Sequence, residues 1–454
     1  MFEQLRKILS GVSADYADIR YEVKRETKIA FNRHELTLMT ANAMDGYVLR
    51  VLKDGGLATI AFTKPEDAGR ATATARENAV LIGKRTKEPV RLAPAPKVKA
   101  FCLPELDRDP RQVPIDEKLE LTRHYNDIPL QTGKVASTET AYEEVVREKY
   151  FASTEGSEVR EDLALNRISG AIITQDGTLT QRVRFGFGGT DGFGRVKDRE
   201  AEVREMTGVA VDLLKAKPVA AGTYRVVLNQ RLGGVFTHEA FGHFSEADII
   251  EDSPTMRAKM ELGAKLGTDI LNIKDDPTRP HQLGFYEYDD EGVAARPTQL
   301  MKSGVLVGRL HSRRTAASYG EPLSGHSVAE DFRFAPIIRM GCIFIEPDGL
   351  NLDDLLAKLG DGLYLLNPMG GQTSGENFTF AASWGFEVKG GKSAGMIRDI
   401  NITGNLYQTL MNIKAVGNDL ELGEIGGCGK GQLNVRSCYG APHILVDGVV
   451  IGGR

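Results

Sequence analysis

Residues 223–250 read TYRVVLNQRLGGVFTHEAFGHFSEADII and decide how the second half of the chain is interpreted. The run TYRVVLN predicts a β-strand. Residues from about Arg231 to Ile250 then follow a helical pattern, so the strand passes directly into a helix. Because this helix carries the most distinctive motif of the chain, it indicates where a functional site lies.

The sequence beyond Ile270 is mostly β-like. Four segments read as strands and hairpins with Ser-Gly, Gly-Gly or Asp-Gly turns, namely residues 298–310, 340–347, 378–397 and 443–453. Such a density of short strands is typical of a barrel or a sandwich. The phosphate-loop-like GFEVKGGKS at residues 385–393 falls within one of these hairpins, and we interpret it as a turn.

The first half of the chain has an α/β pattern. An amphipathic helix opens it, residues 48–62 predict a hairpin, residues 65–84 a helix, and a proline-rich linker covers residues 91–114. A further helix begins near Ile115, strands return over residues 136–195, and a helix covers residues 195–217. The glycine-dense FGFGGTDGFG at residues 185–194 is interpreted as a mobile or ligand-covering loop, or a plain connector, and not as a dinucleotide-binding turn. The overall prediction is an α+β fold with an α/β N-terminal domain over residues 1–217 and a mainly β C-terminal domain over residues 218–454.

Composition excludes several classes of protein. The 454 residues are 41% hydrophobic and 26% charged, values of an ordinary globular chain rather than a disordered or fibrous one. The net charge is −5, without a long basic run, which argues against direct nucleic-acid binding. Four scattered cysteines predict a reducing compartment, and no stretch reaches the apolar length of a membrane span. We therefore predict a cytoplasmic protein.

The motif within the helix is H-E-x-x-x-H, formed by His238, Glu239 and His243. On an ideal helix, residues five apart point about 140° from each other, too far for two imidazoles to bind one metal ion. The helix must therefore bulge or end between them, and we place the break at Gly242. A π-type turn would reduce the angle to roughly 50°.

Glu239 is the natural general base, because a carboxylate beside a catalytic metal can take a proton from water and pass it to a leaving amine. A catalytic zinc site needs a third protein ligand. Glu246, Asp248 and the cysteines are candidates. Cys428 lies in the glycine-rich GEIGGCGKGQ, and Cys438 is its rival, whereas Cys342 in a strand-like run reads as a buried hydrophobe. Glu246 is more simply a residue that steadies the His243 imidazole.

Three segments together resemble the TldD/PmbA family of zinc metalloproteases: HEAFGHFSEAD at residues 238–248, GENFTFAASWGFEVKGGK at 375–392 and GNDLELGEIGGCGKGQ at 417–432. The resemblance implies the catalytic, TldD-like type, with zinc (Zn²⁺) held by His238, His243 and Cys428. It also implies a subunit that pairs with an identical chain or with a PmbA/TldE-like paralogue around an internal chamber, where unfolded peptides are cut.

The predicted function is therefore a zinc-dependent peptidase acting on unfolded peptides inside a dimeric chamber. A non-catalytic scaffold subunit of such a complex is the alternative, and a zinc amidase or deaminase acting on small molecules is a third possibility. An exposed strand edge near the site could hold the peptide by β-augmentation. Gly370, Gly371, Gln372 and Asn377 could lie near a peptide in the cleft, but a tight turn explains the glycines equally well. His311, Arg313, Arg314 and His326 are polar and could lie near the active site, but a surface location is expected instead.

Overall fold

Strand β1 (Tyr16–Asn32) shows why the N-terminal half packs as it does, because its alternate residues face two different environments. Ala17, Ile19 and Ile29 are buried in apolar clusters on one face. Arg20 and Glu22, two even-numbered neighbours, are equally buried but charged. The sheet built around β1 therefore has an apolar face and a charged face. The computed structural model describes residues 1–251 and 253–452, so the last two residues of the predicted C-terminal domain lie outside it.

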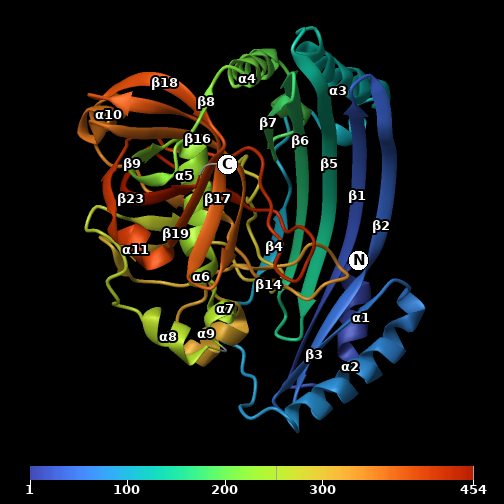
Figure 1. The fold of residues 1–454 in the computed structure, drawn as a ribbon. Coiled ribbons are helices and arrows are strands. Elements are labelled where there is room, and N and C mark those ends of the chain that lie inside the picture. Colours follow the sequence, from blue (N-terminus) through green and yellow to red (C-terminus); the bar gives the residue numbers. More distant parts are fainter. Residues whose placement is uncertain (252, 453–454) are drawn as a thin grey trace.

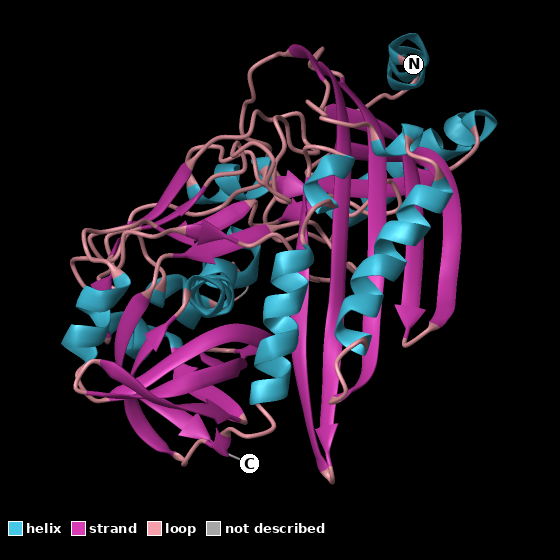
Figure 2. Ribbon diagram, turned by 90° about the horizontal axis from the view of Figure 1, so that it is seen from above, coloured by secondary structure: helices cyan, strands magenta, loops and turns pink. Residues whose placement is uncertain are grey.

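The N-terminal half is one seven-stranded sheet covered by helices (Figure 1). The strands run in the order β3-β2-β1-β5-β6-β4, with β7 beside β6. Their bounds are β2 (Glu35–Lys53), β3 (Gly56–Phe62), β4 (Lys99–Cys102), β5 (Val135–Ser153), β6 (Glu158–Asp176) and β7 (Leu179–Gly189). The helices are α1 (Phe2–Ser10), α2 (Ala68–Gly83), α3 (Ile115–Leu130) and α4 (Glu200–Asp212). All four pack into the apolar clusters of the sheet, and Figure 2 shows helices lying along the long strands.

The charged face of this sheet packs against the C-terminal half. Arg147, which pairs with Glu22 within the sheet, donates to the backbone oxygen of Ala329 at 3.3 Å, and Arg50 reaches Glu291 at 2.6 Å. The guanidinium of Arg20 donates to the backbone oxygen of Asp331 at 3.1 Å. Because a buried charge is costly unless it is paired, these contacts fix how the two halves fit together.

The C-terminal half contains a closed barrel, which confirms the predicted α+β fold with a barrel-like second part. Strands β16, β9, β23, β19 and β17 follow one another, and β17 pairs back with β16. A second, six-stranded sheet runs β12-β11-β10-β15-β22-β21. The strands are β8 (Lys217–Pro218), β9 (Gly222–Leu228), β10 (Ile273–Asp275), β11 (Thr298–Lys302), β12 (Val305–Leu306), β13 (Ser327–Val328), β14 (Ile337–Ile338), β15 (Cys342–Ile345), β16 (Gly362–Ser374), β17 (Asn377–Lys389), β18 (Lys392–Arg398), β19 (Ile400–Asn405), β20 (Ile413–Val416), β21 (Glu421–Leu422), β22 (Cys438–Ala441) and β23 (Ile444–Gly452). The helices are α5 (Gln230–Phe236), a π-turn η4 (Thr237–Gly242), α6 (His243–Ser245), α7 (Ala247–Ile250), α8 (Pro254–Lys259), α9 (Arg313–Tyr319), α10 (Leu352–Leu359) and α11 (Leu406–Met411).

Two sequence interpretations are wrong in part. The segment FGFGGTDGFG is not a loop throughout, because Phe185–Gly189 complete β7 and pair with β6. A Cβ at Gly188 would lie 2.5 Å from the Arg167 Cβ of β6, so this glycine permits close packing inside the sheet rather than mobility. Residues beyond Ile270 are also less regular than predicted, since residues 276–297 form no strand or helix. The predicted hairpin turn at GFEVKGGKS is confirmed, with Gly390 and Gly391 between β17 and β18.

Among the described residues, no helix is both long and apolar enough to cross a membrane.

Candidate metal centre

The helical segment α5–η4–α6 lies between the barrel and the six-stranded sheet, in contact with β16 on one side and β22 on the other. The Asn229 side chain caps its first turn by accepting a hydrogen bond from the Leu232 amide at 3.0 Å. Gly234 lets the helix approach β22, because a Cβ there would lie 2.8 Å from the Gly440 Cα. The GG pair of the sequence therefore brings the motif helix directly onto the strand that carries Tyr439.

The π-turn solves the spacing problem of the H-E-x-x-x-H motif. It spans residues 237–242 and brings the rings of His238 and His243 to a centroid distance of 4.9 Å. The break predicted at Gly242 is part of this bulge and not an end of the helix, because Gly242 is the last residue of the π-turn, has helical φ and ψ of −56° and −49°, and is followed by helix to Ser245. Gly242 is needed for packing instead, since a Cβ there would lie 2.2 Å from Met340 Sδ.

Cys428 completes a cluster with the two histidines. One ligand atom from each of the three side chains lies within 4.8 Å of the others, and Cys428 Sγ is 3.5 Å from His243 Nε2. The loop that carries Cys428 is held by two backbone hydrogen bonds with Val435, at 3.0 and 3.1 Å. Cys438 lies elsewhere, fully buried in β22 beside Cys342 of β15. The structure thus brings together the three residues that the resemblance assigned as ligands and leaves the rival cysteine in the core.

Glu246 orients His243. Its Oε2 lies 3.2 Å from His243 Nδ1, which leaves Nε2 directed at the cluster. Burial raises the pKa of this carboxyl group, but the contacts with His243, Lys430 and Arg339 outweigh it and lower the pKa to about 2. The charged acid therefore supports the imidazole, as its three-residue offset predicts, and Asp248 is paired with Lys430 at 2.8 Å.

The cluster also favours a charged thiol. Burial opposes ionisation of Cys428, yet hydrogen bonding to His238 and His243 lowers the pKa of the thiol to about 5. Burial likewise acts against protonation of His243, and its contacts with Cys428 and Glu246 raise the pKa of the imidazole to about 9. A thiolate is the form of cysteine that binds metal ions.

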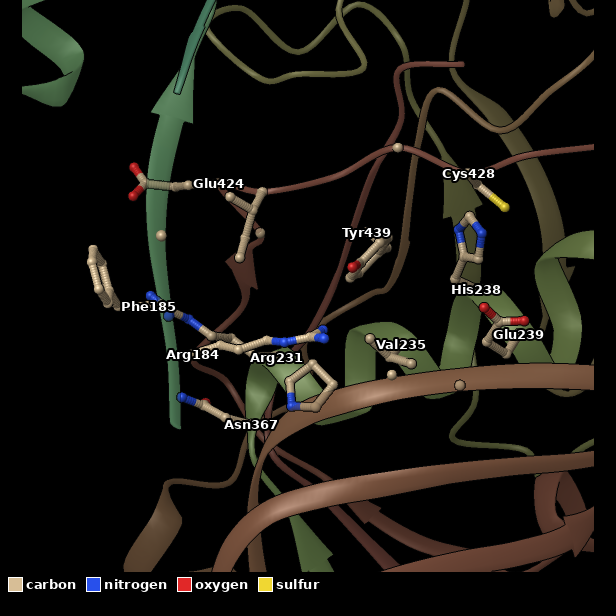
Figure 3. Close-up of a pocket in the computed structure, with 17 residues that line it drawn as sticks. Arg184, Phe185, Arg231, Val235, His238, Glu239, Asn367, Glu424, Cys428 and Tyr439 are labelled. Carbon is tan, nitrogen blue, oxygen red and sulfur yellow. The ribbon is translucent and has the colours of Figure 1, made fainter. Parts of the chain in front are cut away.

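Glu239 faces a cavity of about 190 Å³ that begins at this cluster (Figure 3). Thr373 Oγ1 lies 2.7 Å from the backbone oxygen of Glu239 and 3.0 Å from its Oε2, so the hydroxyl can hold the carboxylate in place. Gly370 and Gly371 line the cavity, whereas Gln372 and Asn377 are exposed and do not, and the proximity of the two glycines to a peptide stays a prediction.

Tyr439 is a cavity residue that the sequence interpretation missed. Its ring packs edge-on to His238 at a centroid distance of 5.2 Å. Burial and the nearby Cys438 and Glu239 raise the pKa of its phenol to about 12, so the hydroxyl keeps its proton at neutral pH. Nothing in the run SCYGAP identifies it. Arg231 and Val235, which also line the cavity, could have been predicted from the sequence. Val235 and His238 follow Arg231 by four and seven residues, so all three lie on one face of a helix.

The expected surface cluster around His311 and His326 is also wrong. Both histidines and Arg313 are buried, at 2%, 0% and 2% exposure. Each is buried because it has polar partners: His326 Nε2 lies 3.0 Å from Asp275, His311 Nε2 lies 2.9 Å from Glu321, and Arg313 pairs with Glu155 at 2.9 Å. Only Arg314 stays partly exposed, paired with Glu251.

Three segments of the chain match known domains, described as PmbA/TldA metallopeptidase domain 1 (residues 17–79), central domain (108–215) and C-terminal domain (221–453). A metalloprotease of Synechocystis is 35% identical over 97% of this chain and 95% of its own length. A zinc metalloprotease TldD homologue of Saccharolobus solfataricus is 30% identical over 69% of this chain and 70% of its own. The crystal structure of TldE from Thermococcus kodakarensis has the same fold, with a TM-score of 0.74 at 17% identity over the whole of both chains. The chain therefore belongs to the TldD/PmbA family of metallopeptidases, as its three sequence motifs indicate.

Proposed function

We propose that the protein is a zinc-dependent peptidase of the catalytic, TldD-like type that cleaves unfolded peptides. The observation that carries the proposal is the meeting of His238, His243 and Cys428 within 4.8 Å at the end of a cavity that Glu239 also lines. A mixed set of imidazole and thiolate donors suits zinc. The buried Nδ1 of His238 has no hydrogen-bond partner among the described residues, which a bound cation or water would relieve.

The residues around the cluster suit peptide hydrolysis. A zinc ion bound there would supply Lewis-acid chemistry at the scissile carbonyl. Glu239, held by Thr373, would accept a proton from the attacking water and deliver it to the leaving nitrogen. The protonated phenol of Tyr439 would donate a hydrogen bond to the oxygen on which negative charge develops.

The wall of the cavity offers an edge to an extended peptide. Strand β16 pairs with β17 along its whole length, but with β9 only from Leu363 to Leu365. The part of β16 around Gly370 and Gly371 therefore has one side that pairs with no strand among the described residues, and both glycines line the cavity. A peptide added there by β-augmentation would be held chiefly by its backbone, which favours unfolded chains over folded ones.

The proposal includes a chamber enclosed by two subunits. The similar fold of TldE supports a TldE-like paralogue as one candidate partner, and an identical chain is the other. The four cysteines are free thiols, the state that a reducing cytoplasm would maintain.

Glu239→Gln tests the proposal against the scaffold alternative. We expect the zinc-loaded protein to cut an unfolded polypeptide such as reduced, alkylated casein, and the variant to lose at least about 10²-fold in rate because a general base is removed. Metal analysis should find the same zinc content in both. Equal cleavage by the two proteins would remove Glu239 from the chemistry. A zinc-loaded protein that cuts nothing, alone or with a paralogue, would support the scaffold function.

A further inference from the structure

The end of the cavity away from the metal cluster carries two arginines. Arg184 comes from β7 of the N-terminal sheet and Arg231 from the first turn of α5. Figure 3 shows both near Asn367, with Val235 and Tyr439 between them and the group formed by His238, Glu239 and Cys428. The two halves of the chain thus build this end of the cavity together.

The charge of these arginines is only partly compensated. Arg184 has no ion-pair or hydrogen-bond partner in residues 1–251 and 253–452, and its side chain is exposed. Arg231 uses its Nε to reach Glu421 at 3.0 Å, which leaves its two terminal nitrogens available. Glu424 also lines the cavity, but Arg195 and Arg199 both bind its carboxylate at 2.6 Å. This end of the cavity therefore has positive charge and free N–H donors.

The helix sets the separation between the arginines and the metal cluster. Arg231 precedes His238 by seven residues, about two helical turns or roughly 10 Å along the axis. An extended peptide spans about 3.3–3.6 Å per residue, so about three residues bridge the two ends of the cavity. One extended peptide can therefore place its scissile bond at the metal cluster and an anionic group at the two arginines.

We propose that Arg184 and Arg231 form a subsite for a peptide carboxylate, which lies about three residues from the scissile bond. The inference rests on the proposed peptidase function. Guanidinium groups bind carboxylates by paired, charge-assisted hydrogen bonds, so the subsite selects peptides that present this group. The carboxylate is either the α-carboxylate of a chain end or an acidic side chain, because an open groove that shares Arg184, Ile425 and Tyr439 continues beyond the cavity.

Binding of labelled peptides to the zinc-loaded Glu239→Gln protein tests the subsite without cleavage. One pair of peptides has the same sequence and ends in a carboxylate or a carboxamide. A second series moves a single Glu along the sequence, each matched by a Gln peptide. We expect the carboxylate to strengthen binding about tenfold or more in one of the two series, which identifies its source. Arg184→Gln and Arg231→Gln should each reduce this ratio, and the double variant should bring it to about one.

Arg225→Gln is the matched control, because Arg225 of β9 pairs with Asp447 at 2.8 Å and lines neither the cavity nor the groove. It should keep the full preference. Equal binding of all charged and neutral peptides, or a preference that survives the double variant, would overturn the subsite. Cleavage of the same peptides by the unsubstituted protein separates the two proposals. A carboxylate preference in binding without any cleavage would reject the peptidase function and keep the subsite. Cleavage without a carboxylate preference would support the peptidase function and reject the subsite.

Discussion

Two pairs of histidines lie in the C-terminal half, His238 with His243 and His311 with His326. Three of the four are buried and His243 is partly exposed, so burial alone does not separate the pairs. His238 is 2% exposed and His326 is fully buried, while His311 is as buried as His238. Their hydrogen bonds differ instead. His326 is bound through both nitrogens, Nδ1 at 2.8 Å from Ser324 O and Nε2 at 3.0 Å from Asp275, and His311 likewise contacts Thr315 and Glu321.

The hydrogen bonding of the two motif histidines, by contrast, is incomplete. His238 has a buried nitrogen without a partner among the described residues, and His243 is supported by Glu246 on one nitrogen while the other faces Cys428. A buried polar atom without a partner costs folding free energy. The comparison therefore separates histidines that complete the core from histidines arranged to bind something else.

Removing a motif histidine should have the largest effect. We expect His238→Ala to lose its zinc and to cut peptides at least about 10³-fold more slowly, because a ligand of the only histidine–cysteine cluster found among the described residues is gone. Metal analysis and cleavage of an unfolded polypeptide check this. Chelation should inactivate the unsubstituted protein, and added zinc should restore it but not the variant. A variant that retained one zinc per chain would contradict the distinction between metal-binding and core histidines.

Tyr439→Phe should have the next largest effect. The substitution keeps the ring against His238 but removes the hydroxyl, so we expect kcat to fall by about 10²-fold while zinc content and KM change little. Steady-state kinetics with a single fluorogenic peptide measure this. A change in KM alone would make Tyr439 a binding residue, and unchanged kinetics would remove it from the chemistry.

The sequence predicted much of this arrangement for identifiable physical reasons. Local periodicity and turn residues are enough to predict the barrel hairpins and the helices of the N-terminal half. The five-residue spacing in the motif requires a bulged helix, and η4 is such a bulge. Partners that depend on long-range packing were not predictable. Nothing near His326 in the chain indicates Asp275, which lies 51 residues away, and Tyr439 reaches the cavity only because two glycines let α5 approach β22.

Glu246→Gln should have a smaller effect on the metal centre. The amide keeps the shape of the side chain but removes the charge that supports His243 and binds Lys430 at 3.1 Å. We expect the affinity for zinc to fall by about 10–100-fold, the usual effect of losing a group that orients a metal ligand. Competition with a zinc-binding dye measures it. At saturating zinc the variant should be nearly as active as the unsubstituted protein, and a large loss that zinc does not restore would give Glu246 another role.

His326→Ala should leave the metal centre unchanged and lower stability instead. The substitution removes one hydrogen-bond partner of the buried Asp275 carboxylate. The Gly341 and Cys342 amides still donate to the same oxygen, at 3.1 and 3.2 Å. We therefore expect a loss of about 2–3 kcal/mol in the free energy of unfolding, which urea denaturation would measure. His326→Gln is the conservative control, since its amide can still donate to Asp275 and should recover part of that loss. Zinc content and kcat should match the unsubstituted protein in both variants. A fall in zinc affinity as large as that of Glu246→Gln would show that the two histidine pairs act together, and the distinction between core and site histidines would then fail.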